Sequence, residues 1–122
     1  MSSEQTSANR ILQLNTLAES PQREPLVVVK RRAWQGVSVE RYHLVNFESP
    51  EISYSNLVVG LSLNGNLVQE VSVNGKRRQF AYTRGDMTLY PAAMPHAGRQ
   101  EKNEPTDSAN IYFTPAFIER LK

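Results

Sequence analysis

Apolar and polar residues alternate along the middle of the chain, between residues 57 and 82. In residues 57–63 an apolar side chain recurs at every second position, which is the period of a β-strand with one buried face. Asn64-Gly65 and Asn74-Gly75 divide the stretch into three runs, and Asn-Gly tolerates the positive φ angles of two-residue hairpin turns. The pattern therefore predicts a three-stranded meander.

Shorter apolar runs on both sides of this stretch predict further strands. They are Leu26–Val29, Val37–Val45, Asp86–Tyr90 and Ala109–Phe113. In the second of them the apolar phase slips near Glu40 and Arg41, which suggests a β-bulge. Many short strands separated by turns, with almost no helix, are typical of an all-β sandwich or barrel.

The N-terminal residues 1–25 differ from this β-rich centre. They are mostly polar and are interrupted by Pro21 and Pro25, so we expect a poorly structured segment. The apolar residues around Leu14 could form either one short helix or a loose strand, and the pattern leaves both open.

The C-terminal residues 114–122 are expected to begin a helix. Thr114 can cap it, and Pro115 suits its first position. Barely two turns follow, and so short a helix is marginal on its own, so the chain looks cut inside or just before a helical region. The predicted units are residues 1–25, a β-domain over 26–113 and this helix.

Composition narrows the class of protein. The sequence has no cysteine, which excludes disulfides, thiolate metal ligands and thiol nucleophiles and fits a reducing compartment. Its polar start argues against a secretory signal, and no apolar run is long enough to span a membrane. A formal net charge of +2 is weak evidence for a nucleic-acid partner. We therefore expect a cytoplasmic protein without a membrane partner.

Residues 85–96 carry the most informative motif. Five residues separate Gly85 from Pro91, and His96 follows Pro91 by five positions. This spacing is similar to the second motif of the cupins, in which the histidine is a ligand in the metal-binding members. The usual glycine between proline and histidine is Ala93 here, and Gln100 replaces the asparagine that often follows.

The other ligands of a cupin metal would come from an earlier segment with two histidines and a glutamate. Residues 50–58 contain no histidine, and no glutamate stands at the expected place. Catalytic metal sites need about three protein ligands, so His96 alone does not make one. We predict no metal and no cofactor, and we expect His96 to be a hydrogen-bonded residue of a turn or pocket rim.

Several segments together resemble the N-terminal regulatory domain of AraC-family transcription regulators. Trp34–Tyr42 looks like its opening strand, and Ile111–Ile118 resembles its closing strand and first helix. The likeness covers about residues 33–121 and implies a cupin-like jelly-roll barrel (double-stranded β-helix) with a short C-terminal helix. It also implies a domain that binds an effector or a second protomer, while DNA is read by a helix-turn-helix domain that this chain lacks.

We therefore expect a regulatory sensor and dimerisation domain and not an enzyme. A small-molecule effector would bind in the barrel mouth, and the apolar side of the final helix would pair two chains as a homodimer. Strand phase and hydrogen-bonding capacity select the polar lining of such a pocket as Tyr42, Tyr54, Arg78, Tyr82 and His96.

Two alternatives stay open. A stand-alone, metal-free cupin enzyme of the isomerase or epimerase type would use His96 or His43 as its base. A purely structural dimerisation barrel would have a filled core. The basic runs Lys30-Arg31-Arg32 and Lys76-Arg77-Arg78 could contact nucleic acid, but charge beside a tight turn more often keeps an exposed strand edge from pairing.

Overall fold

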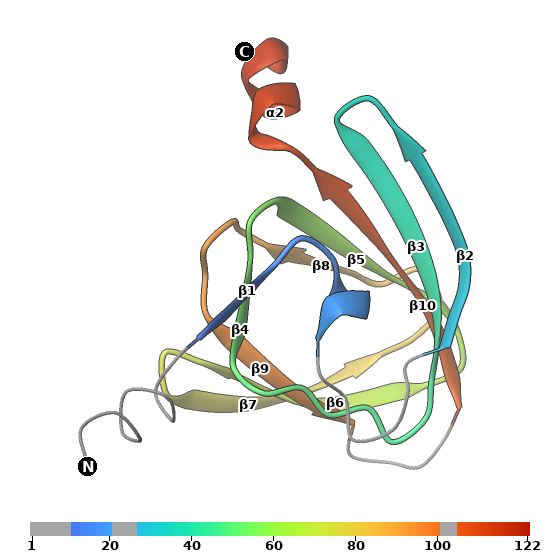
Figure 1. The fold of residues 1–122 in the computed structure, drawn as a ribbon. Coiled ribbons are helices and arrows are strands. Elements are labelled where there is room, and N and C mark those ends of the chain that lie inside the picture. The colour runs from blue at the N-terminus through green and yellow to red at the C-terminus, as the bar shows by residue number, and fades with distance from the viewer. Residues whose placement is uncertain (1–10, 21–26, 101–104) are drawn as a thin grey trace.

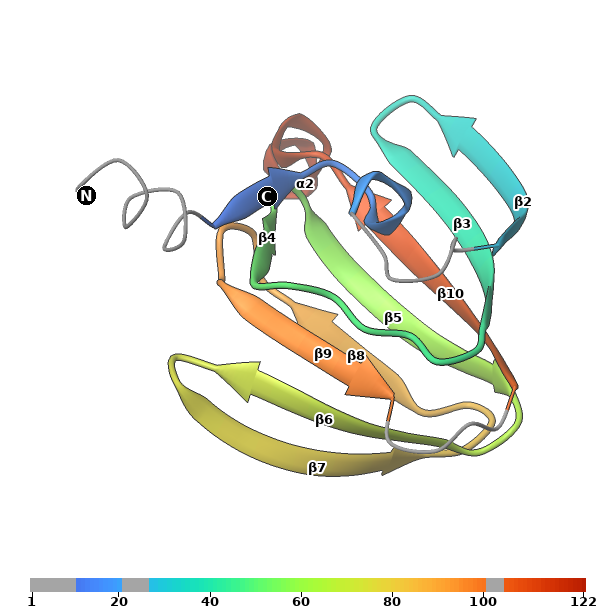
Figure 2. The ribbon, with the colours of Figure 1, turned by 60° about the horizontal axis from the view of Figure 1, so that its bottom comes forward.

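The computed structural model describes residues 11–20, 27–100 and 105–122, which form two five-stranded sheets around a common interior (Figures 1 and 2). Sheet A contains, in spatial order, β1 (Leu12–Leu14), β4 (Ile52–Tyr54), β9 (His96–Gln100), β6 (Leu67–Val73) and β7 (Lys76–Tyr82). Sheet B contains β2 (Val27–Trp34), β3 (Val37–Leu44), β10 (Thr106–Phe113), β5 (Leu57–Asn64) and β8 (Met87–Tyr90).

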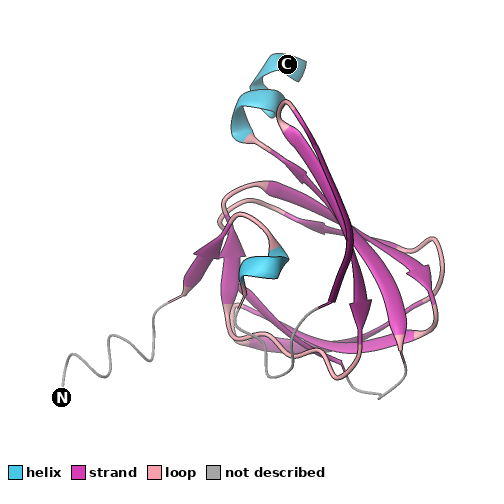
Figure 3. Ribbon diagram, turned by 45° about the vertical axis from the view of Figure 1, so that its right-hand side comes forward, coloured by secondary structure: helices cyan, strands magenta, loops and turns pink. Residues whose placement is uncertain are grey.

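Two short helices accompany the sheets. The 3-10 helix η1 (Leu17–Glu19) lies between the sheets, and α2 (Pro115–Leu121) extends beyond the end of β10 (Figure 3). As predicted, Thr114 caps α2, because its hydroxyl oxygen accepts a hydrogen bond from the Phe117 N–H at 3.2 Å. The prediction of an all-β jelly-roll barrel with a short C-terminal helix is confirmed.

The predicted three-stranded meander is wrong, because β5 and β6 lie in different sheets. β5 pairs with β10 and β8, whereas β6 pairs with β7 and β9. Asn74-Gly75 does close a hairpin, with φ angles of 52° and 77°. At Asn64-Gly65 only the glycine has a positive φ, 82°, and the chain there crosses between sheets. Alternation reports which face of a strand is buried and does not identify the neighbouring strand.

The predicted bulge near Glu40 and Arg41 is wrong as well. β3 pairs with β10 in unbroken register along its whole length, and the shift lies in the adjacent β2, between Val28 and Lys30. The apolar phase only seems to slip, because Glu40 points inward and is 1% exposed. A buried carboxylate occupies a position that the pattern reserves for an apolar residue.

Residues 11–20 are ordered, which corrects the expectation of a poorly structured segment over 1–25. β1 pairs with β4 in parallel and η1 follows it, so the apolar residues form first a strand and then a turn of helix. Leu14 and Leu17 are both buried in the barrel, and burial of this apolar surface holds the segment in place. The rest of the segment lies outside the described residues.

The sequence pattern also missed β4 and β9. All three residues of β4 are buried, so it shows no alternation. β9 pairs with β6, and two of its positions, His96 and Gln100, are polar and yet buried. Hydrophobic periodicity cannot detect a strand whose buried positions are polar.

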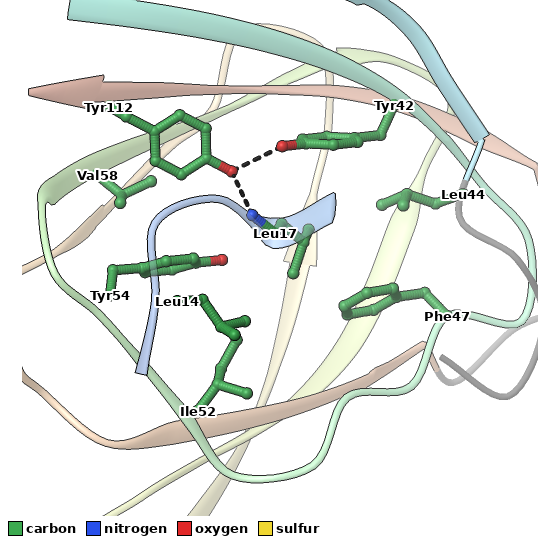
Figure 4. Packing of buried hydrophobic residues seen from close by; sticks show 9 residues of the cluster. All are labelled: Leu14, Leu17, Tyr42, Leu44, Phe47, Ile52, Tyr54, Val58 and Tyr112. Carbon is green, nitrogen blue, oxygen red and sulfur yellow. Dashed lines mark hydrogen bonds between the residues drawn. The ribbon is translucent and has the colours of Figure 1, made fainter. Parts of the chain in front are cut away.

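The core contains apolar side chains and three tyrosines, which Figure 4 shows from close by. The cluster joins β1, η1, both sheets and the loop before β4. Its members are Leu14, Leu17, Tyr42, Leu44, Phe47, Ile52, Tyr54, Val58 and Tyr112.

A chain of hydrogen bonds runs through this core. The Tyr42 hydroxyl donates to the Glu40 carboxylate, whose other oxygen pairs with Arg31 Nη2 at 2.6 Å. The hydroxyl oxygens of Tyr42 and Tyr112 lie 2.6 Å apart, and the Leu17 N–H donates to the Tyr112 oxygen at 2.8 Å (Figure 4). Because the hydrogen of Tyr42 goes to the carboxylate, Tyr112 must donate to Tyr42.

Ala93 adopts a left-handed backbone conformation, with φ 64°, at the position where the cupin motif usually has glycine. Its N–H donates to the Tyr54 carbonyl oxygen at 2.8 Å, which ties the turn before β9 to β4. The left-handed conformation costs a residue with a Cβ about 1–2 kcal/mol, so this turn is strained.

Replacing Tyr112 by phenylalanine should lower the free energy of unfolding by about 2–3 kcal/mol. The Leu17 N–H then loses its acceptor and the Tyr42 oxygen its donor, and each buried unsatisfied group costs about 1–3 kcal/mol. Urea denaturation measures the loss. Tyr90→Phe is the control, because the Tyr90 hydroxyl has no hydrogen bond to the residues described, and about 0.5 kcal/mol or less is expected. Equal losses in both variants would contradict the prediction.

Replacing Ala93 by glycine should raise the free energy of unfolding by about 0.5–1 kcal/mol. Relief of the left-handed strain exceeds the entropy that glycine adds to the unfolded chain. Ala92→Gly is the matched control, because Ala92 has no positive φ, and it should destabilise the fold by a similar amount. Denaturation curves of the two variants would refute the strain argument if they shifted in the same direction.

Candidate functional site

A cavity of about 70 Å³ lies between the two sheets. Its walls are the inner faces of the sheets, and Leu17 and Phe47 add apolar surface. Polar side chains from the strands and the loops that join them make up much of the lining. They are Tyr42, Ser49, Tyr54, Ser62, Gln69, Tyr82, Asp86, Thr88, Tyr90, His96, Ser108 and Asn110.

Four of the five residues predicted for the pocket line this cavity: Tyr42, Tyr54, Tyr82 and His96. The fifth, Arg78, lies on β7 outside the cavity and is exposed. β7 is the last strand of sheet A, and its hairpin with β6 extends the inner face of that sheet beyond the cavity. The predicted strand phase correctly places Arg78 on the inner face of sheet A. Arg78 lies, however, on the part of that face beyond the cavity.

His96 is held between aromatic rings. The Tyr90 ring stacks on the imidazole with centroids 4.7 Å apart, and the Tyr54 ring lies at 5.3 Å. Burial lowers the pKa of His96, so the imidazole is neutral at pH 7. Nδ1 lies 3.1 Å from the Met94 carbonyl oxygen, which can only accept, so Nδ1 carries the hydrogen. Nε2 is then a free acceptor, since it bonds to none of the described residues.

The opposite wall carries hydroxyl and amide groups from β10. Asn110 Nδ2 donates to the Tyr112 oxygen at 3.1 Å, which fixes the orientation of its amide. The Ser108 hydroxyl is buried and has no hydrogen-bond partner among the described residues. A buried hydroxyl without a partner is costly unless something in the cavity completes its hydrogen bonds.

Sequence reasoning missed Ser62, Tyr90, Ser108 and Asn110. The spacing of Ser108 and Asn110 could have identified them. Together with Tyr112 they occupy every second position of β10, so all three side chains point to the same, inward face. The prediction assumed that the apolar positions of each strand point into the interior. Where the interior is polar, as on β8 and β10, the inward positions are those between the apolar ones.

The arrangement is suited to binding through hydrogen bonds. Within the described part of the chain, no three His, Asp or Glu side chains come together in a group that could hold a metal ion. Ile52, an apolar residue, stands opposite His96 in the pairing of β4 with β9. The Asp86 carboxylate accepts from the Thr83 N–H at 2.8 Å and so closes the turn before β8.

His43, the other histidine considered as a base, lies outside the cavity. It is half-buried on β3, and its Nδ1 is 2.9 Å from an Asp107 carboxylate oxygen. The hydrogen bond with His43 lowers the pKa of Asp107. Of the two histidines considered as a base, His96 lines this cavity and His43 does not. None of the helices described is long and apolar enough to cross a membrane.

Solved structures that share this fold include two cupin domains and an oxalate oxidase. A cupin 2 conserved barrel domain protein from Salinispora arenicola has a TM-score of 0.60 at 17% identity, over 84% of this chain and 87% of its own. A cupin domain from Bordetella pertussis gives 0.57 at 12%, over 81% and 99%. Oxalate oxidase in complex with glycolate gives 0.54 at 15%, over 66% and 43%. At these identities the likeness concerns the fold alone.

The sequence itself places the chain more narrowly. No curated protein matches it. The model of one family, the AraC-like ligand-binding domain, matches residues 36–122, which span β3 to α2 and include most of the cavity lining. The chain belongs to the AraC-like ligand-binding domain family, and its fold is a cupin-like barrel.

Proposed function

We propose that this chain is the sensor domain of an AraC-type transcription regulator and binds a small, uncharged, polar effector in the barrel cavity. The observation that carries the proposal is the cavity lining. It presents the free acceptor Nε2 of His96 and the unpaired hydroxyl of Ser108, and the carboxylate in the lining, that of Asp86, accepts a hydrogen bond from the Thr83 N–H. Membership of a ligand-binding family supports the same function.

The size of the cavity limits the effector. Small-molecule sites usually measure about 300–1,000 Å³, whereas this cavity holds about 70 Å³. The proposed effector is therefore a molecule of a few non-hydrogen atoms, or the buried end of a longer one. Its donor groups would face His96, and its acceptors would face the hydroxyls of β5 and β10.

Regulation would require the domain to act on a partner. We propose a homodimer in the cytoplasm, with DNA read by a helix-turn-helix domain that is not among the residues described.

The outward positions of sheet B support dimerisation. Across β2, β3, β10 and β5 the paired residues Trp34, Val37, Phe113 and Leu57 form one outward row. The neighbouring outward row consists of Val39, Ile111, Val59 and Leu89.

This outward face of sheet B is large enough to consider as an interface. Trp34, Met87 and Leu89 are 58%, 70% and 59% exposed. With roughly 200 Å² for each whole side chain, these three expose about 400 Å², half of the ~800 Å² that each partner of a standard interface buries. α2 continues the face, because Phe117 stacks on Phe113 with centroids 5.9 Å apart and Leu121 is 67% exposed.

Replacing His96 by glutamine should weaken effector binding by no more than about tenfold. One hydrogen bond is worth about 0.5–1.5 kcal/mol net, and 1.4 kcal/mol is a factor of ten in affinity. Thermal-shift screening of small polar metabolites would supply the ligand, and calorimetric titration would measure both proteins. His43→Gln is the matched control and should bind as the wild type does.

Three results would count against the sensor. Turnover of the ligand by wild type but not by His96→Gln would establish an enzyme, since loss of a general base commonly costs about 10²–10⁴ in rate. Equal loss of affinity in both histidine variants would remove His96 from the site. If no ligand shifts the melting midpoint, a structural dimerisation barrel explains the chain better.

Replacing Leu89 by glutamate should raise the dissociation constant of the homodimer at least about tenfold. The carboxylate would have to be desolvated at an apolar interface, where an unpaired charge costs more than 1.4 kcal/mol. Sedimentation velocity over a range of concentrations measures the equilibrium. Gln79→Glu, on the exposed strand β7 of sheet A, is the control. A wild type that is monomeric at every concentration would refute the dimer.

A further inference from the structure

The inner face of sheet A continues past the cavity onto the β6–β7 hairpin. Residues directly opposite on paired antiparallel strands point to the same side, and Val71 pairs with Arg78 while Val73 pairs with Lys76. Val71 lines the cavity and also a second hollow, a groove of about 400 Å³ formed with Val73, Lys76, Arg78 and Phe80. The hairpin therefore carries a groove next to the cavity and distinct from it.

The groove exposes apolar surface. β7 is the outermost strand of sheet A, and Figure 2 shows it along the lower edge of the molecule. Phe80 is 39% exposed, and the ring contact that it makes is with Tyr82 beside it, at 5.9 Å. Exposed aromatic and branched side chains on a concave surface are the usual lining of a small-molecule site.

Two cations stand at this groove without a partner. Lys76 and Arg78 are two positions apart on one strand face, so their Cα atoms are about 7 Å apart. Neither forms an ion pair or hydrogen bond with the residues described, and the groove lining contains no carboxylate. The nearby Glu70 points to the opposite face of the sheet. There its carboxylate oxygen Oε2 lies 3.7 Å from Arg99 Nη2.

Inward-pointing charges on an edge strand can have the sole role of preventing that strand from pairing with another chain. That role is satisfied by charge alone and needs no apolar surface. Here two cations border a groove that also exposes an aromatic ring. Such a groove is complementary to a molecule with an apolar body and one negatively charged end. Arg78 offers the planar donor pair that carboxylates accept in two parallel hydrogen bonds.

We propose that this groove binds an apolar monocarboxylate, with its carboxylate on Arg78 and Lys76 and its apolar body on Val71, Val73 and Phe80. The site goes beyond the proposed effector cavity and does not depend on it. It gives the domain a second ligand class, anionic and apolar, beside the neutral polar one of the interior.

Titration with decanoate at submillimolar concentration tests the proposal. Calorimetry should show saturable binding that weakens as salt is raised, because the contact is between exposed charges. Arg78→Gln should weaken it at least about tenfold, and Lys76→Gln several-fold, as expected for loss of a charged hydrogen bond. Arg77→Gln removes the same charge from the opposite face of β7 and should change the affinity less than about twofold.

A neutral ligand and a map of the contacts complete the test. Decanol should bind more weakly than decanoate, and amide shifts in NMR spectra should concentrate on Val71, Val73 and Phe80. Circular dichroism shows that each variant is folded. Equal binding of decanol, equal effects of Arg77→Gln and Arg78→Gln, shifts centred on Met87 and Leu89, or no saturable binding would each overturn the proposal. A failed metabolite screen for the cavity would leave this result unaffected.

Discussion

The barrel is organised around the Glu40 carboxylate in its interior. A charge in that position is unfavourable unless it is paired and hydrogen-bonded, and the neighbouring elements supply an ion pair to one carboxylate oxygen and a hydrogen bond to the other. Arg31 reaches it from β2, and Tyr42 donates to it from the next inward position of β3. Hydrogen bonds from Tyr112 and from the Leu17 N–H continue this network, so that an ion pair from β2 and hydrogen bonds from β3, β10 and η1 meet in one place.

This polar interior also explains the outside of the molecule. Side chains alternate between the two faces of a strand, so a strand with polar inward positions has its apolar residues facing out. In β3 the inward Glu40 and Tyr42 alternate with outward residues such as Val39, and in β8 the inward Thr88 and Tyr90 alternate with Met87 and Leu89. The same alternation thus produces a hydrogen-bonding cavity and an apolar outer face.

Family and structure contribute different parts of the functional conclusion. The family gives the class, an AraC-like ligand-binding domain, and the fold gives a barrel that cupins with other activities share. The particular residues give the chemistry. His96 keeps the position of the cupin motif, but its neighbours are Ile52, which pairs with it across the sheet, and the rings of Tyr54 and Tyr90. Ala93 even retains the glycine-like conformation of the motif.

The sequence alone determined the β class, the β6–β7 hairpin, the start of α2 and the motif around His96, because each depends on residues close together in the chain. It also selected four residues of the cavity lining. Only the tertiary structure decided that β5 and β6 separate, that β4 and β9 are strands, and that Arg78 lies beyond the cavity. Those features depend on pairing between distant strands and on which face of each strand turns inward. Hydrophobic alternation leaves the pairing undetermined, and it predicts the wrong face where the interior is polar, as at Glu40 and Asn110.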